Sequence, residues 1–205
     1  MASPFFDPKQ PVTIWKRNLP HWEQAGKIHY VTFRLHDSIP QHVVERYKDM
    51  KRWFLETHPR PWDDTVMRSY SELISNPIEG FLDAGYGECV LKYPDVRQYL
   101  IDSIGFYDGS RFDVLAYVIM PNHVHMLAVP SDDYSLDETL KSIMRFTAGK
   151  INRHMGKKGQ LWQTEPFDRI VRSGLHYNHC LDYIRHNPDN LPPGTYAFGG
   201  REFRS

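Results

Sequence analysis

The fold is decided by the stretch Tyr117-Val118-Ile119-Met120-Pro121-Asn122-His123-Val124-His125-Met126-Leu127-Ala128-Val129. It contains two apolar runs that meet at a Pro-Asn pair, which predicts two strands joined by a turn. Because side chains alternate between the two faces of a strand, His123 and His125 point the same way and Val124 points into the core. Two imidazoles on one face can bind one metal ion. The alternative is that the pair fills a polar sheet face.

The rest of the chain supplies periodic segments on both sides of this pair. An alternating β-branched and aromatic run predicts a strand at 28–35, and helical spacing predicts a helix at 41–56. Pro94 fits the first turn of a helix over 94–107, and Ser135 with Glu138 forms a capping box for a helix that ends near His154. A strand at 167–172 and a helix over 175–186, ended by Asn187-Pro188, complete the order.

This order of elements predicts the fold class. We expect an α+β, ferredoxin-like sandwich with a four-stranded antiparallel sheet packed by helices, an insertion and a C-terminal helix. The third strand, with its two histidines, would then lie in the sheet centre. We expect one domain over 1–205, with an extended N-terminal arm at 1–27. The irregular, acidic segment 59–92 is expected to be an insertion with one short helix at 65–75.

Composition limits the class of protein. Hydrophobic residues make up 40% and charged residues 24% of the 205 residues, as in ordinary globular domains. Apolar runs are too short to cross a membrane, so no membrane partner is expected. The N-terminus does not have the layout of a signal peptide. Only Cys89 and Cys180 are present, outside any CxxC pair, so we expect neither disulfides nor a thiolate zinc site, and a cytoplasmic location.

The charges are unevenly distributed although the formal net charge is zero. Residues 139–173 carry eight basic and two acidic residues, a net of +6, whereas 59–138 carry five basic and fourteen acidic residues, a net of −9. The basic residues are Lys141, Arg145, Lys150, Arg153, Lys157, Lys158, Arg169 and Arg172. Such clustering is typical of a surface that contacts phosphates, although a solvated helix face is the alternative. Trp162 either stacks on an unpaired base or packs in the core.

The last predicted helix presents one polar stripe. Spacing by four places His179, Tyr183 and Asn187 on one face, and Leu181 and Ile184 towards the opposite side. This face offers an imidazole, a phenol and an amide oxygen. A tyrosine in such a stripe can also be an ordinary amphipathic filler.

Several stretches, taken in their order along the chain, resemble one known family. Met120-Pro121-Asn122-His123-Val124-His125 is similar to the HUH motif of single-tyrosine transposases. The stretches Leu161-Trp162-Gln163, Phe167-Asp168-Arg169-Ile170-Val171-Arg172 and Asp182-Tyr183-Ile184-Arg185-His186-Asn187-Pro188 look like the downstream pattern of the REP-associated tyrosine transposases. The stretches 19–23 and 30–35 also resemble that family, so the likeness covers roughly residues 19–190.

The resemblance implies a metal-dependent endonuclease and strand transferase that acts on single-stranded DNA next to hairpins of REP-like palindromes. It implies that His123, His125 and Asn187 are ligands of Mg²⁺ or Mn²⁺, and that Tyr183 is the nucleophile of a 5′-phosphotyrosine intermediate. The two residues from the last helix are those that spacing had already placed on one face. His179 is a candidate auxiliary base or ligand. The basic residues listed above and Trp162 would bind DNA, and we expect a monomer with a cis tyrosine, with a dimer left open.

Two other classes of function stay open from the residues alone. A DNA-binding regulator without turnover could use the same basic surface. A metal-dependent hydrolase of nucleotides or small molecules could use the histidine pair, although a histidine triad would want a third alternating histidine where the chain has Leu127.

Overall fold

The computed structural model describes residues 3–16, 20–59 and 62–203, and the chain divides into two compact units. The first unit consists of Met1–His36 with Val90–Ser205, and the second of Asp37–Cys89. The second unit therefore begins before the expected insertion at 59–92 and includes the helix that we had placed in the sandwich.

The second unit is helical. It contains α1 (Gln41–Thr57), α2 (Asp64–Tyr70), a π-helical turn η1 (Ser71–Ser75) and α3 (Asn76–Asp83). Its buried side chains come from both ends of the segment, because Val43 of α1 packs in one cluster with Ile39 and Leu82. The Phe54 ring stacks on His58 and meets the edges of Trp62 and Tyr70. The apolar stripe of α1 is thus used within this unit, which explains why the unit begins at Asp37.

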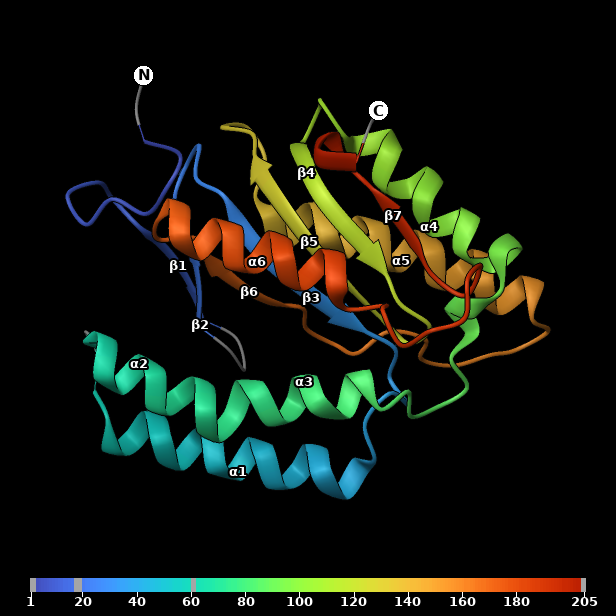
Figure 1. Cartoon of the computed structure of the whole chain (residues 1–205), viewed down its shortest axis with the longest axis horizontal. Coiled ribbons are helices and arrows are strands. Elements are labelled where there is room, and N and C mark those ends of the chain that lie inside the picture. The colour runs from blue at the N-terminus through green and yellow to red at the C-terminus, as the bar shows by residue number, and fades with distance from the viewer. Residues whose placement is uncertain (1–2, 17–19, 60–61, 204–205) are drawn as a thin grey trace. The chain divides into compact units, whose positions relative to one another are not determined.

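The first unit is an α+β sandwich, as expected, but its sheet has five strands instead of four (Figure 1). The sheet order is β6-β3-β5-β4-β7, with every neighbouring pair antiparallel. The strands are β3 (His29–Arg34), β4 (Phe112–Ile119), β5 (His123–Pro130), β6 (Phe167–Ile170) and β7 (Ala197–Gly199). The fifth strand, β7, adds to the free edge of β4. Its three residues are too few to show alternation in the sequence.

The N-terminal arm is also more ordered than an extended segment. Strands β1 (Thr13–Lys16) and β2 (Pro20–Glu23) form a separate two-stranded antiparallel sheet. The helices of the unit are α4 (Pro94–Tyr107), α5 (Leu136–His154) and α6 (Gly174–His186), with 3₁₀ turns η2 (Val90–Lys92) and η3 (Arg201–Phe203). These helix bounds agree with the sequence-based ranges to within one residue.

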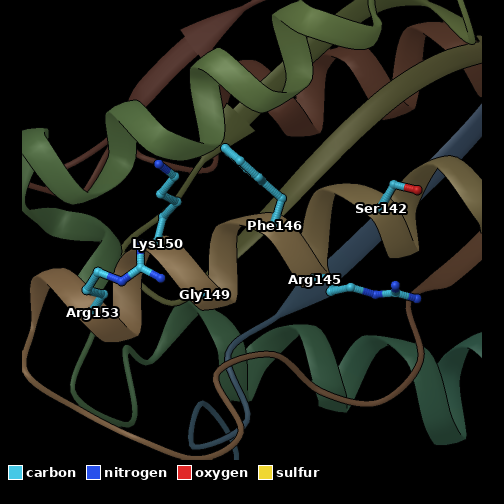
Figure 2. Close-up of a pocket in the computed structure, with 6 residues that line it drawn as sticks. All are labelled: Ser142, Arg145, Phe146, Gly149, Lys150 and Arg153. Carbon is cyan, nitrogen blue, oxygen red and sulfur yellow. The ribbon is translucent and has the colours of Figure 1, made fainter.

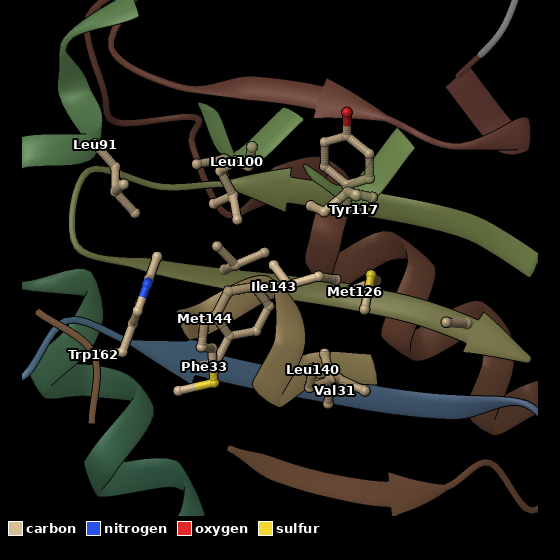
Figure 3. Packing of buried hydrophobic residues seen from close by; sticks show 14 of the residues in the cluster. Val31, Phe33, Leu91, Leu100, Tyr117, Met126, Leu140, Ile143, Met144 and Trp162 are labelled. Carbon is tan, nitrogen blue, oxygen red and sulfur yellow. The ribbon is translucent and has the colours of Figure 1, made fainter. Parts of the chain in front are cut away.

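Helices α4 and α5 cover one face of the sheet. Helix α5 turns basic side chains outward (Figure 2) and apolar side chains onto the sheet (Figure 3). The sheet side of this core consists of alternate strand residues such as Val31, Phe33, Val124 and Met126. Each is at most 1% exposed, so one full face of β3 and β5 is spent on the hydrophobic core.

Helix α6 covers the other face. Its Cys180, Leu181 and Ile184 pack in a second cluster with strand residues of the opposite parity, including Tyr30 and Leu127. The histidines of β5 belong to this same parity. The sheet therefore separates α4 and α5 from α6 and the histidine pair.

Candidate functional site

The histidine pair begins the central strand of the sheet. His123 and His125 follow the turn at Met120–Asn122, where the backbone N–H of Met120 donates to the carbonyl of His123 at 2.8 Å. Both side chains are fully buried, and their ring centroids lie 4.6 Å apart. Because β5 has β3 on one side and β4 on the other, the pair is held by two hydrogen-bonded ladders. The expected placement in the centre of the sheet is confirmed.

Helix α6 brings the phenol and the amide to this pair. The helix begins after Ser173, whose side chain accepts a hydrogen bond from the backbone N–H of His176. Two turns later, the ring centroid of Tyr183 lies 5.0 Å from that of His125. Asn187 caps the end of the helix, and its side chain forms a hydrogen bond with His123. The histidine pair of β5 and the Tyr183–Asn187 pair of α6, which sequence spacing predicted separately, therefore lie together.

Burial controls the protonation of the two imidazoles. It lowers the pKa of His123 to about 3, and the hydrogen bond to Asn187 only partly opposes this effect. The pKa of His125 lies well below its ordinary value, first because of burial and then because of the nearby His123 and Arg169. Both rings are thus neutral at neutral pH, which is the form that binds metal ions.

The donors present fit a divalent cation. The Nε2 atom of His125 is buried and has no hydrogen-bond partner in the described parts of the chain, as expected of a nitrogen that awaits a ligand. Within residues 3–16, 20–59 and 62–203, no three His, Cys, Asp or Glu side chains gather into a metal site. The amide of Asn187, which lies beside His123, is a further donor of another type. Two imidazoles and one amide oxygen form a mixed nitrogen and oxygen donor set that a divalent cation can accept.

Cationic groups surround the α6 side of the site. Arg169 of β6 lies with its guanidinium 4.9 Å from the centroid of the Tyr30 ring. The pKa of His176 is lowered to about 4, first by burial and then by the nearby Arg169, Arg172 and His179. His179 itself is exposed, one turn before Tyr183. Arg169 and Arg172 thus lie on the α6 side of the site, close to His176.

The remaining basic residues lie on the other side of the sheet. Arg145, Lys150 and Arg153 line a groove of about 490 Å³ on the outer face of α5, together with Phe146, which is 50% exposed (Figure 2). Lys141 forms an ion pair with Asp137 at 2.7 Å, while Lys157 and Lys158 are exposed after the helix. The sequence grouped these residues with Arg169 and Arg172 as one DNA-binding set, and the structure places the α5 residues and Arg169 on opposite sides of the sheet. The sequence of α5 does not indicate on which face of the sheet the helix packs.

Trp162 does not have the exposure that base stacking requires. Its side chain is only 4% exposed, its ring meets the edge of Phe33, and its Nε1 donates to Thr147 Oγ1 at 2.9 Å. A base could stack on it only if the core opened. Of the two roles that the sequence left open, packing in the core is therefore the correct one.

Three residues that touch the histidines were missed in the sequence. Asn122 is 1% exposed, and its Oδ1 lies 2.7 Å from Nδ1 of His123. Tyr30 and Thr32 of β3 lie beside His125. Asn122 had been assigned only to the turn. The alternation of residues 28–35 does place Tyr30 and Thr32 on one face, but only the register of β3 against β5 shows what they contact.

The chain was compared with family models, curated proteins and solved structures. Residues 91–187 match the family model described as "Transposase IS200 like". A solved structure of a REP-associated tyrosine transposase bound to a REP hairpin aligns with 83% of this chain and 71% of its own, at 16% identity and a TM-score of 0.44. No curated protein matches the sequence. Within the described residues, none of the helices is both long and apolar enough to span a bilayer.

Proposed function

We propose that the chain is a metal-dependent single-stranded DNA endonuclease and strand transferase, because residues 91–187 match the model of the IS200-like transposases. In this proposal it cleaves next to a DNA hairpin and passes through a 5′-phosphotyrosine intermediate. The matched segment begins before the histidine pair and ends at Asn187, so it includes all four proposed site residues.

One observation carries the proposal, namely the meeting of a neutral histidine pair with a tyrosine and an amide from another element. The His125 and Tyr183 rings lie 5.0 Å apart, and Asn187 reaches His123. A histidine pair alone would serve many metal-dependent hydrolases. A phenol held beside it adds a nucleophile that can form a covalent intermediate.

The roles of the residues follow from their chemistry. His123, His125 and Asn187 would hold the cation, which when bound polarises the scissile phosphate and lowers the barrier to attack. The Tyr183 oxygen forms a bond to phosphorus and releases its proton, the bond from phosphorus to the 3′ oxygen breaks, and the 3′ oxygen takes up a proton. The phosphate ester is conserved in the link to Tyr183, so a 3′-OH can attack it and rejoin strands.

The charged groups divide the DNA between two surfaces. Arg169 and Arg172 lie on the site side and would contact the strand that is cleaved. The groove of α5, with Arg145, Lys150 and Arg153 around exposed Phe146, would bind DNA away from the cleaved phosphate. In a hairpin with a single-stranded flank, the flank would be the cleaved strand and the hairpin would be the DNA bound away from the cleaved phosphate.

Covalent capture tests the proposal. A labelled hairpin oligonucleotide with a single-stranded flank is incubated with the protein and Mn²⁺, and the products are separated under denaturing conditions. We expect a protein–DNA adduct that Tyr183→Phe abolishes. Tyr177→Phe is the matched control, because Tyr177 lies on the same helix but its hydroxyl donates to Glu202 at 2.9 Å.

The outcomes separate the candidate functions. An adduct that survives in Tyr183→Phe contradicts the assigned nucleophile. Hairpin binding without an adduct for the unmodified protein favours a non-catalytic DNA-binding regulator. Phosphodiester hydrolysis that is lost in His123→Ala but kept in Tyr183→Phe favours a metal-dependent hydrolase.

A further inference from the structure

Two hydroxyl groups lie behind His125, on the neighbouring strand. Thr32 is the residue of β3 directly opposite His125, and its Oγ1 lies 2.9 Å from Nδ1 of the ring. The Tyr30 hydroxyl lies 2.8 Å from the same nitrogen. Tyr30 is 1% exposed and Thr32 is 9% exposed, so water does not compete freely for these contacts. Both residues lie outside the segment that matches the transposase family.

These contacts select one tautomer of the ring. With the proton on Nδ1, the N–H donates to a hydroxyl oxygen and Nε2 keeps a lone pair. With the proton on Nε2, a buried N–H would face no acceptor, because that atom has no hydrogen-bond partner in the described part of the chain. The first tautomer leaves no N–H of the imidazole unsatisfied, and it presents Nε2 as the ligand nitrogen.

The orientation of the ring is fixed as well. The Tyr30 ring stacks on His125 with a centroid distance of 5.6 Å and an interplanar angle of 18°. Arg169 lies over the Tyr30 ring, and Tyr183 meets His125 nearly at right angles. The imidazole thus has contacts to its Nδ1 atom, to its plane and to its edge, all from buried or partly buried groups.

We propose that Tyr30 and Thr32 are positioning residues, which hold His125 as the Nδ1-protonated tautomer and present its Nε2 to a divalent cation. This inference rests on the proposed function, since it takes His125 as a metal ligand. It extends the site to β3, whose stretch 30–35 resembles the family but contributes no predicted site residue and lies outside the matched segment 91–187. Hydrogen-bonded groups behind a ligating histidine characteristically raise metal affinity by fixing the tautomer and the ring orientation.

The tautomer can be measured without any metal. In the metal-free protein, ¹⁵N–¹H correlation spectra of the histidine rings should show His125 with a protonated Nδ1 and an unprotonated Nε2. In the double variant Tyr30→Phe/Thr32→Val the two tautomers should mix. A wild-type spectrum with a protonated Nε2 would overturn the inference whatever the fate of the proposed function.

Metal affinity gives the second measurement. Titration with Mn²⁺, followed by electron paramagnetic resonance of the free ion, should show affinity weaker by about 10- to 100-fold in the double variant. Thr32→Ser keeps the hydroxyl and should restore most of the affinity. Tyr99→Phe is the matched control, because it removes a tyrosine hydroxyl 3.2 Å from Nδ1 of His154, on the other side of the sheet.

The results distinguish this inference from its premise. Wild-type Mn²⁺ binding with an unchanged affinity in the double variant overturns the positioning role and leaves the proposed function standing. A wild-type protein that binds no Mn²⁺ overturns the metal site and its positioning residues together. A folded double variant, shown by an unfolding transition like that of Tyr99→Phe, excludes loss of the fold as the cause of weaker binding.

Discussion

The two faces of strand β5 differ in the kind of side chain that they carry. Val124 and Met126 point into a dry core under α4 and α5, whereas His123 and His125 point to the face that α6 covers. Both sets are buried to the same degree, so exposure does not distinguish them. They differ in what meets them, since apolar side chains surround one set and hydroxyls, an amide and a phenol surround the other. One strand thus supplies stability with one parity and chemistry with the other.

The largest expected effect comes from the core face. Met126→Ala removes a fully buried side chain from the α5 side, and we expect it to lower the free energy of unfolding by roughly 2–5 kcal/mol. Urea denaturation measures this loss. The Mn²⁺ affinity of the folded fraction should stay near that of the wild type, and a large loss of affinity would show that the two faces are not separable.

Acid should destabilise the site face. The pKa of His123 is about 3 in the folded chain against an ordinary 6.5, so the unfolded state binds more protons between these values. Stability therefore falls as pH is lowered below 6.5, by about 2 kcal/mol at pH 5 from His123 alone. Denaturation of the metal-free protein at pH 7, 6 and 5 checks this. His123→Gln should reduce the loss of stability between pH 7 and pH 5, whereas the same change at exposed His186 should not.

A smaller effect separates the two basic surfaces. The triple change Arg145→Gln/Lys150→Gln/Arg153→Gln removes the cations of the α5 groove and should weaken hairpin binding by about tenfold, with a shallower dependence on salt. Cleavage at saturating DNA should persist, because these groups lie across the sheet from Tyr183. Binding measured by fluorescence anisotropy at several salt concentrations tests this, with exposed Lys9→Gln as control. Equal loss of the cleavage rate at saturation would place the groove within the site.

The smallest effect compares the two serine caps. Ser135 begins α5 and Ser173 begins α6, and each side chain accepts a backbone N–H of the first turn. Replacement by Ala should cost about 1 kcal/mol of unfolding free energy in either case. Only Ser173→Ala should also slow adduct formation, because α6 carries Tyr183. Equal adduct rates in the two variants would mean that the cap does not influence the position of the phenol.

The sequence predicts best what depends on local pattern. Two kinds of local prediction are confirmed, namely the strand pair around Pro121 and the helix starts at Pro94 and Ser135, because turn, cap and alternation are properties of neighbouring residues. The resemblance to single-tyrosine transposases is confirmed by the family model. Strand β7 was missed because three residues next to Tyr196 carry no periodic signal. The second unit was placed too late because the stripe of α1 looks the same whether it packs on a sheet or on α3.

The site divides in the same way. Spacing along β5 places the two histidines on one face of the strand. Spacing along α6 places Tyr183 and Asn187 on one face of the helix. The side of the sheet on which a helix packs, and the register that sets Thr32 opposite His125, depend on tertiary structure. For this reason the sequence could not separate the α5 cations from Arg169 and Arg172, and Trp162 was assigned two possible environments.

The placement of the proposed ligands on a central strand and on a helix end has a consequence for the lifetime of the site. Amides of β5 are bonded on both sides and should exchange with solvent only when the whole first unit opens, whereas the last turn of α6, where Asn187 is the cap, can open alone. On warming, the third donor would be lost while the histidine pair is still in place. Inactivation should therefore precede melting, and the interval between the two temperatures reports how tightly the end of α6 is held.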